Sequence, residues 1–61
     1  MILHDLLNVI AEEQTIRIMD RTTTIYTGEL DEWEDRETFK DWEIVRVYVG
    51  VFGTLTINIE K

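Results

Sequence analysis

The sequence contains no cysteine, one histidine and three glycines among its 61 residues. The absence of cysteine excludes a disulfide framework and a thiolate metal site. The glycines Gly28, Gly50 and Gly53 do not have the spacing of a phosphate-binding loop. His4 has no partner at a spacing that suggests catalysis, and Thr22–Thr24 is typical of a turn and a strand rather than of a nucleophile. We therefore expect no enzyme, no metal site and no cofactor.

Long apolar runs are also absent, and the N-terminus has no basic flank before an apolar stretch. We expect a soluble, cytoplasmic protein without a membrane partner. The length favours one domain, residues 1–61, near the lower size at which a chain folds without cross-links. For so short a chain, the free energy of burial and the cost of ordering nearly cancel. Self-association as a homodimer therefore stays open, because it would add buried area.

Basic residues are scarce: the chain has six, against thirteen acidic residues, and its net charge is −7. Eight of the acids and two of the bases lie between positions 29 and 43, so this stretch carries most of the net charge. Phosphate backbones repel an acidic chain, which disfavours direct nucleic-acid binding and favours a basic partner protein. The eight acids are Glu29, Asp31, Glu32, Glu34, Asp35, Glu37, Asp41 and Glu43.

The strongest structural signal is a period of two in residues 42–60, which predicts two strands joined by a turn. Their alternating apolar positions are Val45, Val47 and Val49 in the first strand and Leu55, Ile57 and Ile59 in the second. A hairpin that places these two sets opposite each other needs a loop with an odd number of residues. Val51-Phe52-Gly53 supplies it, with Gly53 left-handed after a type I turn. We expect the valines to be buried beneath a helix.

That helix is predicted over residues 1–13. Its apolar residues recur at helical spacing and are Leu3, Leu6, Leu7 and Ile10. A helix of this length is marginal alone and must pack on the sheet face that carries the valines.

A second hairpin is predicted from residues 14–20 and 24–28, with Ile18 opposite Ile25. We expect a four-residue loop begun by Asp20. A two-residue loop of Arg21-Thr22 would lack the glycine or asparagine that such turns use.

Residues 29–41 are predicted as a loop with one or two helical turns, because like charges four residues apart oppose a continuous helix. Trp33 and Phe39 are either lids on the core or anchors for a partner. The run Asp31–Asp35 is rich in oxygen ligands but lacks the central glycine of a calcium loop, so a solvated acidic face is expected.

The order of elements predicts an α+β fold, with the N-terminal helix packed on a four-stranded antiparallel meander sheet. An SH3-like small barrel is the alternative, since short twisted strands can close over one core.

Two surfaces are candidates for binding. The first is the acidic stretch, with predicted partner-binding residues Asp31, Glu32, Trp33, Glu34, Asp35 and Glu37. The second is the sheet face away from the helix, whose residue types are enriched at interfaces. This alternative interface is expected to carry Arg17, Tyr26, Arg46 and Tyr48, together with Met19, Thr24, Ile44 and Thr56.

The pattern as a whole resembles that of short uncharacterised proteins carried by bacterial phages and other mobile elements. The resemblance lies in the leucine-rich start Met1–Leu7, the tyrosine-glycine turn Tyr26-Thr27-Gly28 and the closing alternating hairpin. It implies a function like that of small acidic phage proteins, anti-CRISPR proteins among them, that block the nucleic-acid surfaces of host nucleases. We expect a non-catalytic module that binds a basic, nucleic-acid-handling protein. The alternative is a structural protein that forms homo-oligomers through the helix-free sheet face.

Overall fold

The computed structural model describes residues 1–61, which form four strands and four short helical segments. The strands are β1 (Thr15–Asp20), β2 (Thr23–Glu29), β3 (Glu43–Val49) and β4 (Leu55–Glu60). The helical segments are α1 (Leu3–Leu7), η1 (Leu30–Glu32), α2 (Arg36–Phe39) and η2 (Val51–Gly53). None of the helices has the length and apolar character needed to cross a membrane.

The α+β class is confirmed, but the antiparallel meander is wrong. The four strands lie in the order β2-β1-β4-β3, and the central pair β1 and β4 is parallel. This pairing puts the isoleucine-rich strands side by side in the middle of the sheet, where Ile16, Ile18 and Ile57 are fully buried. β2 and β3 form the two edges, so the sheet does not close into a barrel.

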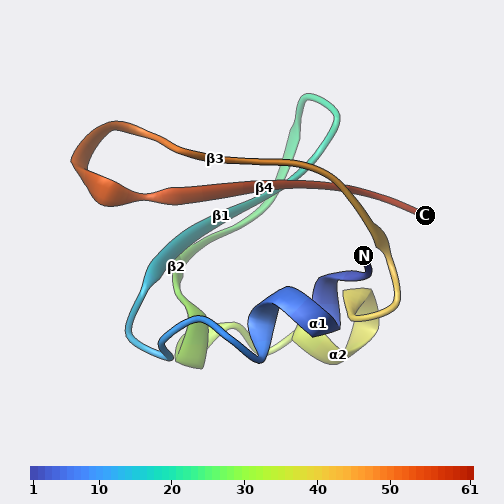
Figure 1. Ribbon diagram of the computed structural model, residues 1–61, viewed down its shortest axis with the longest axis horizontal. Helices are drawn as coiled ribbons and strands as arrows, with labels where there is room; N and C mark the ends of the chain where they lie inside the picture. Colours follow the sequence, from blue (N-terminus) through green and yellow to red (C-terminus); the bar gives the residue numbers. More distant parts are fainter.

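The helical segments α1, η1 and α2 lie on one side of the sheet, as Figure 1 shows, and η2 is the turn between β3 and β4. α1 covers five residues instead of the thirteen predicted. Leu3 and Leu7 are buried against the central isoleucines, so the leucine spacing identified the correct face but not the length. So short a helix depends on tertiary contacts. The start of the chain is held against residues 42–44: the Leu3 N–H donates to Trp42 O at 2.8 Å and the Ile44 N–H donates to Met1 O at 2.9 Å.

The predicted register of the β3–β4 hairpin is confirmed next to its turn, where Val47 lies opposite Ile57 and Val49 opposite Leu55. Gly53 is left-handed as predicted, with φ at 77°, but Phe52 is also left-handed at 63°, so the type I turn is wrong. Farther along, Val45 is an extra residue in a β-bulge, which turns Ile44 toward the core, opposite Ile59.

The predicted burial of the three valines is wrong. Val45, Val47 and Val49 are 58%, 42% and 70% exposed. Val47 and Val49 share a face with Ile57 and Leu55, as expected, but α1 is too short to lie over them. The hairpin extends beyond the helices toward the left of Figure 1.

The register of the β1–β2 hairpin also differs from the prediction. The loop is the two-residue turn Arg21-Thr22, in which Arg21 adopts a positive φ of 58° despite its side chain. Ile25 is an extra residue in a bulge, so Tyr26, not Ile25, lies opposite Ile18. The connection from β2 to β3 is a loop with two short helical turns, η1 and α2, as predicted.

Candidate functional site

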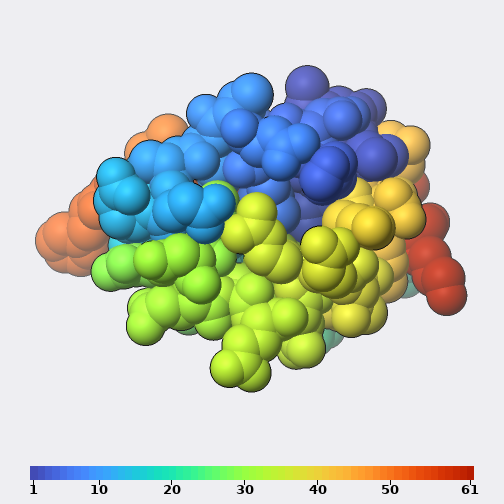
Figure 2. All heavy atoms as spheres, turned by 90° about the horizontal axis from the view of Figure 1, so that it is seen from below, coloured from blue at the N-terminus to red at the C-terminus, as the bar shows by residue number.

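The acidic segment, residues 29–43, forms the lower half of the face shown in Figure 2, from green to yellow. All eight of its acidic residues are exposed. Its two basic residues form ion pairs: Arg36 with Glu12 at 3.3 Å and Lys40 with Glu37 at 3.2 Å. The segment keeps its strong negative charge because these two bases are outnumbered four to one.

The backbone of the acidic segment is anchored to the rest of the protein. The Leu30 N–H donates to Gln14 O at 3.1 Å, and the Asp31 N–H donates to Glu12 O at 2.9 Å. Leu30 is fully buried. The carboxylates therefore project from a fixed backbone and not from a free loop.

Three aromatic rings of the segment form a row with Tyr26 of β2. Trp33 stacks on Tyr26 with ring centroids 5.4 Å apart and on Phe39 at 6.0 Å, and Phe39 meets Trp42 edge to face at 4.9 Å. Trp33 is 4% exposed and belongs to the core. Its position does not support a role as a partner anchor, and of the predicted binding residues only the five acids lie at the surface.

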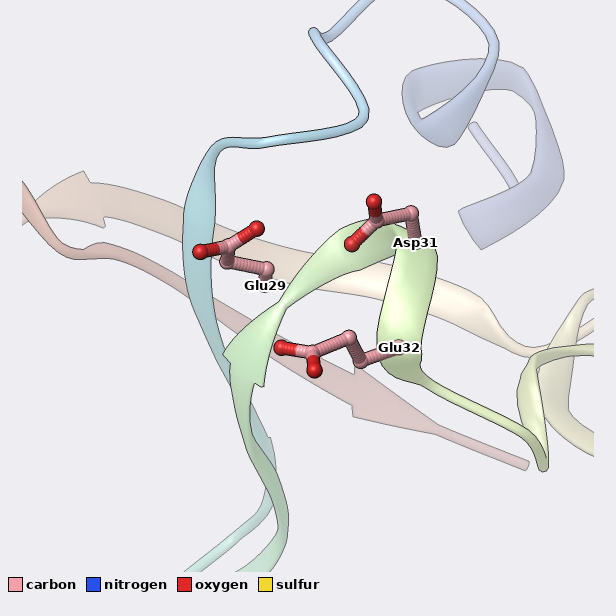
Figure 3. A group of neighbouring side chains, drawn as sticks. All are labelled: Glu29, Asp31 and Glu32. Carbon is pink, nitrogen blue, oxygen red and sulfur yellow. The ribbon is translucent and has the colours of Figure 1, made fainter.

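Three carboxylates gather where β2 passes into η1. One oxygen of each of Glu29, Asp31 and Glu32 lies within 4.8 Å of the others. Figure 3 shows the three side chains around this point of the chain. Partial burial, followed by the negative charges of Glu32, Asp31 and Glu29, raises the pKa of Tyr26. The Tyr26 hydroxyl donates to Glu29 O at 2.6 Å. All three acidic side chains are exposed, so the trio is an acidic surface that attracts cationic groups.

The alternative interface loses two of its predicted members. The bulges at Ile25 and Val45 turn Tyr26 and Ile44 to the helix side, where both pack against the core. Arg17, Arg46 and Tyr48 remain on the helix-free face, beside Met19 and Thr56, as expected from their pairing. Neither Arg17 nor Arg46 forms an ion pair.

The exposed apolar residues along β3 and its turn were missed as a surface by sequence reasoning. The valine alternation predicts a buried face, and the local pattern does not predict that α1 ends at Leu7. The run of apolar residues through the turn, Val49 to Phe52 around Gly50, was the available signal.

His4, on α1, is exposed, and its Nε2 lies 3.2 Å from Asn8 Nδ2.

Comparison of the chain with known protein families, with curated proteins and with solved structures gives no match.

Proposed function

We propose that this protein is a non-catalytic binding module whose acidic segment engages a basic, nucleic-acid-handling protein in the cytoplasm. The observation that carries the proposal is the display of eight exposed carboxylates on one anchored backbone segment. The resemblance to small phage proteins fits an inhibitor of this kind.

Electrostatics gives such a surface two advantages. A field of one sign speeds the encounter with an oppositely charged partner and disfavours wrong partners. Because Leu30 and Trp33 hold the segment in place, binding does not have to order it. Carboxylates fixed in this way can occupy the contacts that a basic protein uses for phosphates.

The test is capture of partners from a nuclease-treated lysate of the natural host, followed by binding measurements with the purified partner. We expect the affinity to fall steeply with salt, and the triple variant Glu32→Lys, Glu34→Lys, Asp35→Lys to lose binding while staying folded. A matched variant, Asp5→Lys, Glu13→Lys, Glu60→Lys, changes the net charge equally outside the segment and should bind. Retained binding by the first variant, or equal loss in both, would contradict the proposal.

Self-association through the helix-free face is less favoured. With Tyr26 and Ile44 turned away, that face keeps Arg17 and Arg46, which have no acidic partner. A two-fold interface built on this face would bring like charges of the two copies together.

A further inference from the structure

The edge strand β3 and the turn after it carry an uncovered apolar row. Its members are Val45, Val47, Val49, Val51 and Phe52, which are 58%, 42%, 70%, 80% and 102% exposed. None belongs to the core, the strand has no lysine or proline, and Arg46 is its only charged residue between the bulge and the turn. Natural proteins protect sheet edges with charges, bulges or a covering element, and an exposed apolar edge strand is a site for pairing with another chain.

The backbone of β3 offers free hydrogen-bonding groups on the same edge. The Gly50 N–H donates to Thr54 O at 2.7 Å, at the start of the ladder with β4. Bonded and non-bonded pairs alternate along an antiparallel ladder, so Tyr48 and Arg46 also bond to β4. The N–H and C=O groups of Val47 and Val49 then point outward, where the sheet has no further strand.

The first residues of β3 are already covered. The N-terminal residues Met1–Leu3 lie along this edge, bonded to Trp42 and Ile44, with a bridge between Ile2 and Glu43. The open edge therefore begins after the bulge at Val45 and ends at the turn.

We propose that a second copy of the chain pairs antiparallel with this edge through its own β3, about a two-fold axis at Tyr48. Val47 then lies opposite Val49 of the second copy, and Arg46 lies opposite Gly50 of the second copy. The outward groups of Val47 and Val49 in each copy satisfy those of the other, and one eight-stranded sheet results.

The side chains fit this register. The valine pairs lie on one face of the joined sheet, while Tyr48 meets Tyr48 of the second copy on the other. Gly50 has no side chain, which leaves room for Arg46 of the second copy beside the Tyr48 ring. The exposed turn residue Phe52 is brought toward Met1 of the second copy, which is 72% exposed.

Neighbouring registers are less favourable. Residues that lie opposite each other in the two copies must share a face of the joined sheet. The two-fold axis can therefore lie only at a residue of β3 and not between two residues. An axis at Arg46 would set two arginines against each other. An axis at Val47 would push the turn into the edge already occupied by Met1–Leu3, and an axis at Val49 would pair Val47 with Val51, beyond the end of the strand.

Sedimentation equilibrium from micromolar to millimolar concentration tests the dimer. We expect Val49→Lys to raise the dissociation constant about tenfold or more, because the charge lies in the apolar row. Val9→Lys, at a residue 77% exposed and outside the edge, is the matched control and should not change it. A protein that stays monomeric throughout, or equal effects of the two variants, would overturn the proposal.

Salt separates this dimer from the partner complex of the proposed function. Two copies with a net charge of −7 repel each other, so salt should strengthen the dimer. Binding of a basic partner by the acidic segment should instead weaken with salt. The proposed dimer and the proposed partner complex can therefore be disproved independently of each other.

A cross-link tests the register without altering the valines. In the proposed pairing, the two Tyr48 Cα atoms form a non-bonded pair about 4.5 Å apart, within the range of a disulfide. Because the chain has no cysteine, Tyr48→Cys should give a covalent dimer on mild oxidation. Thr24→Cys, exposed on the other edge strand, should stay monomeric. Equal cross-linking of both variants would contradict the register, as would none at Tyr48→Cys.

Discussion

The hairpins β1–β2 and β3–β4 share three features. Each places its outer strand at an edge of the sheet, each outer strand has one bulge, and each turn contains a non-glycine residue with positive φ, Arg21 or Phe52. They differ in what lies over them. The bulge at Ile25 turns Tyr26 under Trp33, whereas Val47 and Val49 stay exposed.

This difference shows that apolar alternation does not decide burial by itself. The segment after β2 folds back as η1 and α2 and brings its aromatic rings over Tyr26, while β3 leads into a turn that extends past the helices (Figure 1). The edge strand of one hairpin therefore has a ring packed over its face beside an acidic surface, and the edge strand of the other keeps its apolar side chains exposed.

The largest expected effect comes from truncation in the central strands. Ile18→Ala, at a fully buried position, should lower the free energy of unfolding by about 3–4 kcal/mol. Val47→Ala, at an exposed position of the same sheet face, should lower it by only about 0.5 kcal/mol. Urea denaturation of the monomer measures both. Equal losses would mean that β3 is covered after all.

The next effect distinguishes the glycines of the two hairpins. A Cβ at Gly28 would lie 2.6 Å from the Tyr26 hydroxyl oxygen, and its φ is 151°, so Gly28→Ala should destabilise by about 2 kcal/mol. At Gly50 the nearest atom would be Thr54 O at 3.5 Å, an ordinary contact, and Gly50→Ala should be nearly neutral. Thermal unfolding of the two variants, under conditions where both are monomeric, compares them. A tolerated Gly28→Ala would mean that Tyr26 is not held across the end of β2.

The smallest expected effect is at high pH. Because the pKa of Tyr26 is raised in the folded protein, the unfolded chain ionises this phenol first, and stability should fall as the pH rises through about 10. In the Tyr48→Phe variant, absorbance titration follows Tyr26 alone, and the folded protein should titrate above the urea-unfolded one. Coincident titrations would show that neither partial burial nor the acidic trio raises the pKa of Tyr26.

Part of this architecture follows from the sequence. The register of β3 and β4 next to their turn follows from the alternation and from an odd loop that ends on the left-handed Gly53, although the type I turn itself is wrong. The pairing of β1 with β4 does not follow from the sequence. A period of two shows which residues of a strand share a face, but it does not show which other strand lies beside that strand. The local sequence does indicate the two bulges, because the adjacent apolar residues Ile25-Tyr26 and Ile44-Val45 break the alternation.

The acidic segment could be located from the sequence because its charges are contiguous, and charged side chains are rarely buried. The open edge of β3 could not be located from the sequence. Its exposure depends on where α1 ends and where the aromatic rings of a distant segment pack, and both are set by tertiary contacts of residues such as Leu7 and Trp33.

The most direct test of this account is amide hydrogen exchange, resolved by residue, at micromolar and at millimolar protein. The Arg46 and Tyr48 amides, which bond to β4, should be protected at both concentrations. The Val47 and Val49 amides should exchange freely in the dilute protein and become protected in the concentrated one, where the second copy covers them. Exchange at Val47 and Val49 that does not depend on concentration would contradict the proposed pairing of β3.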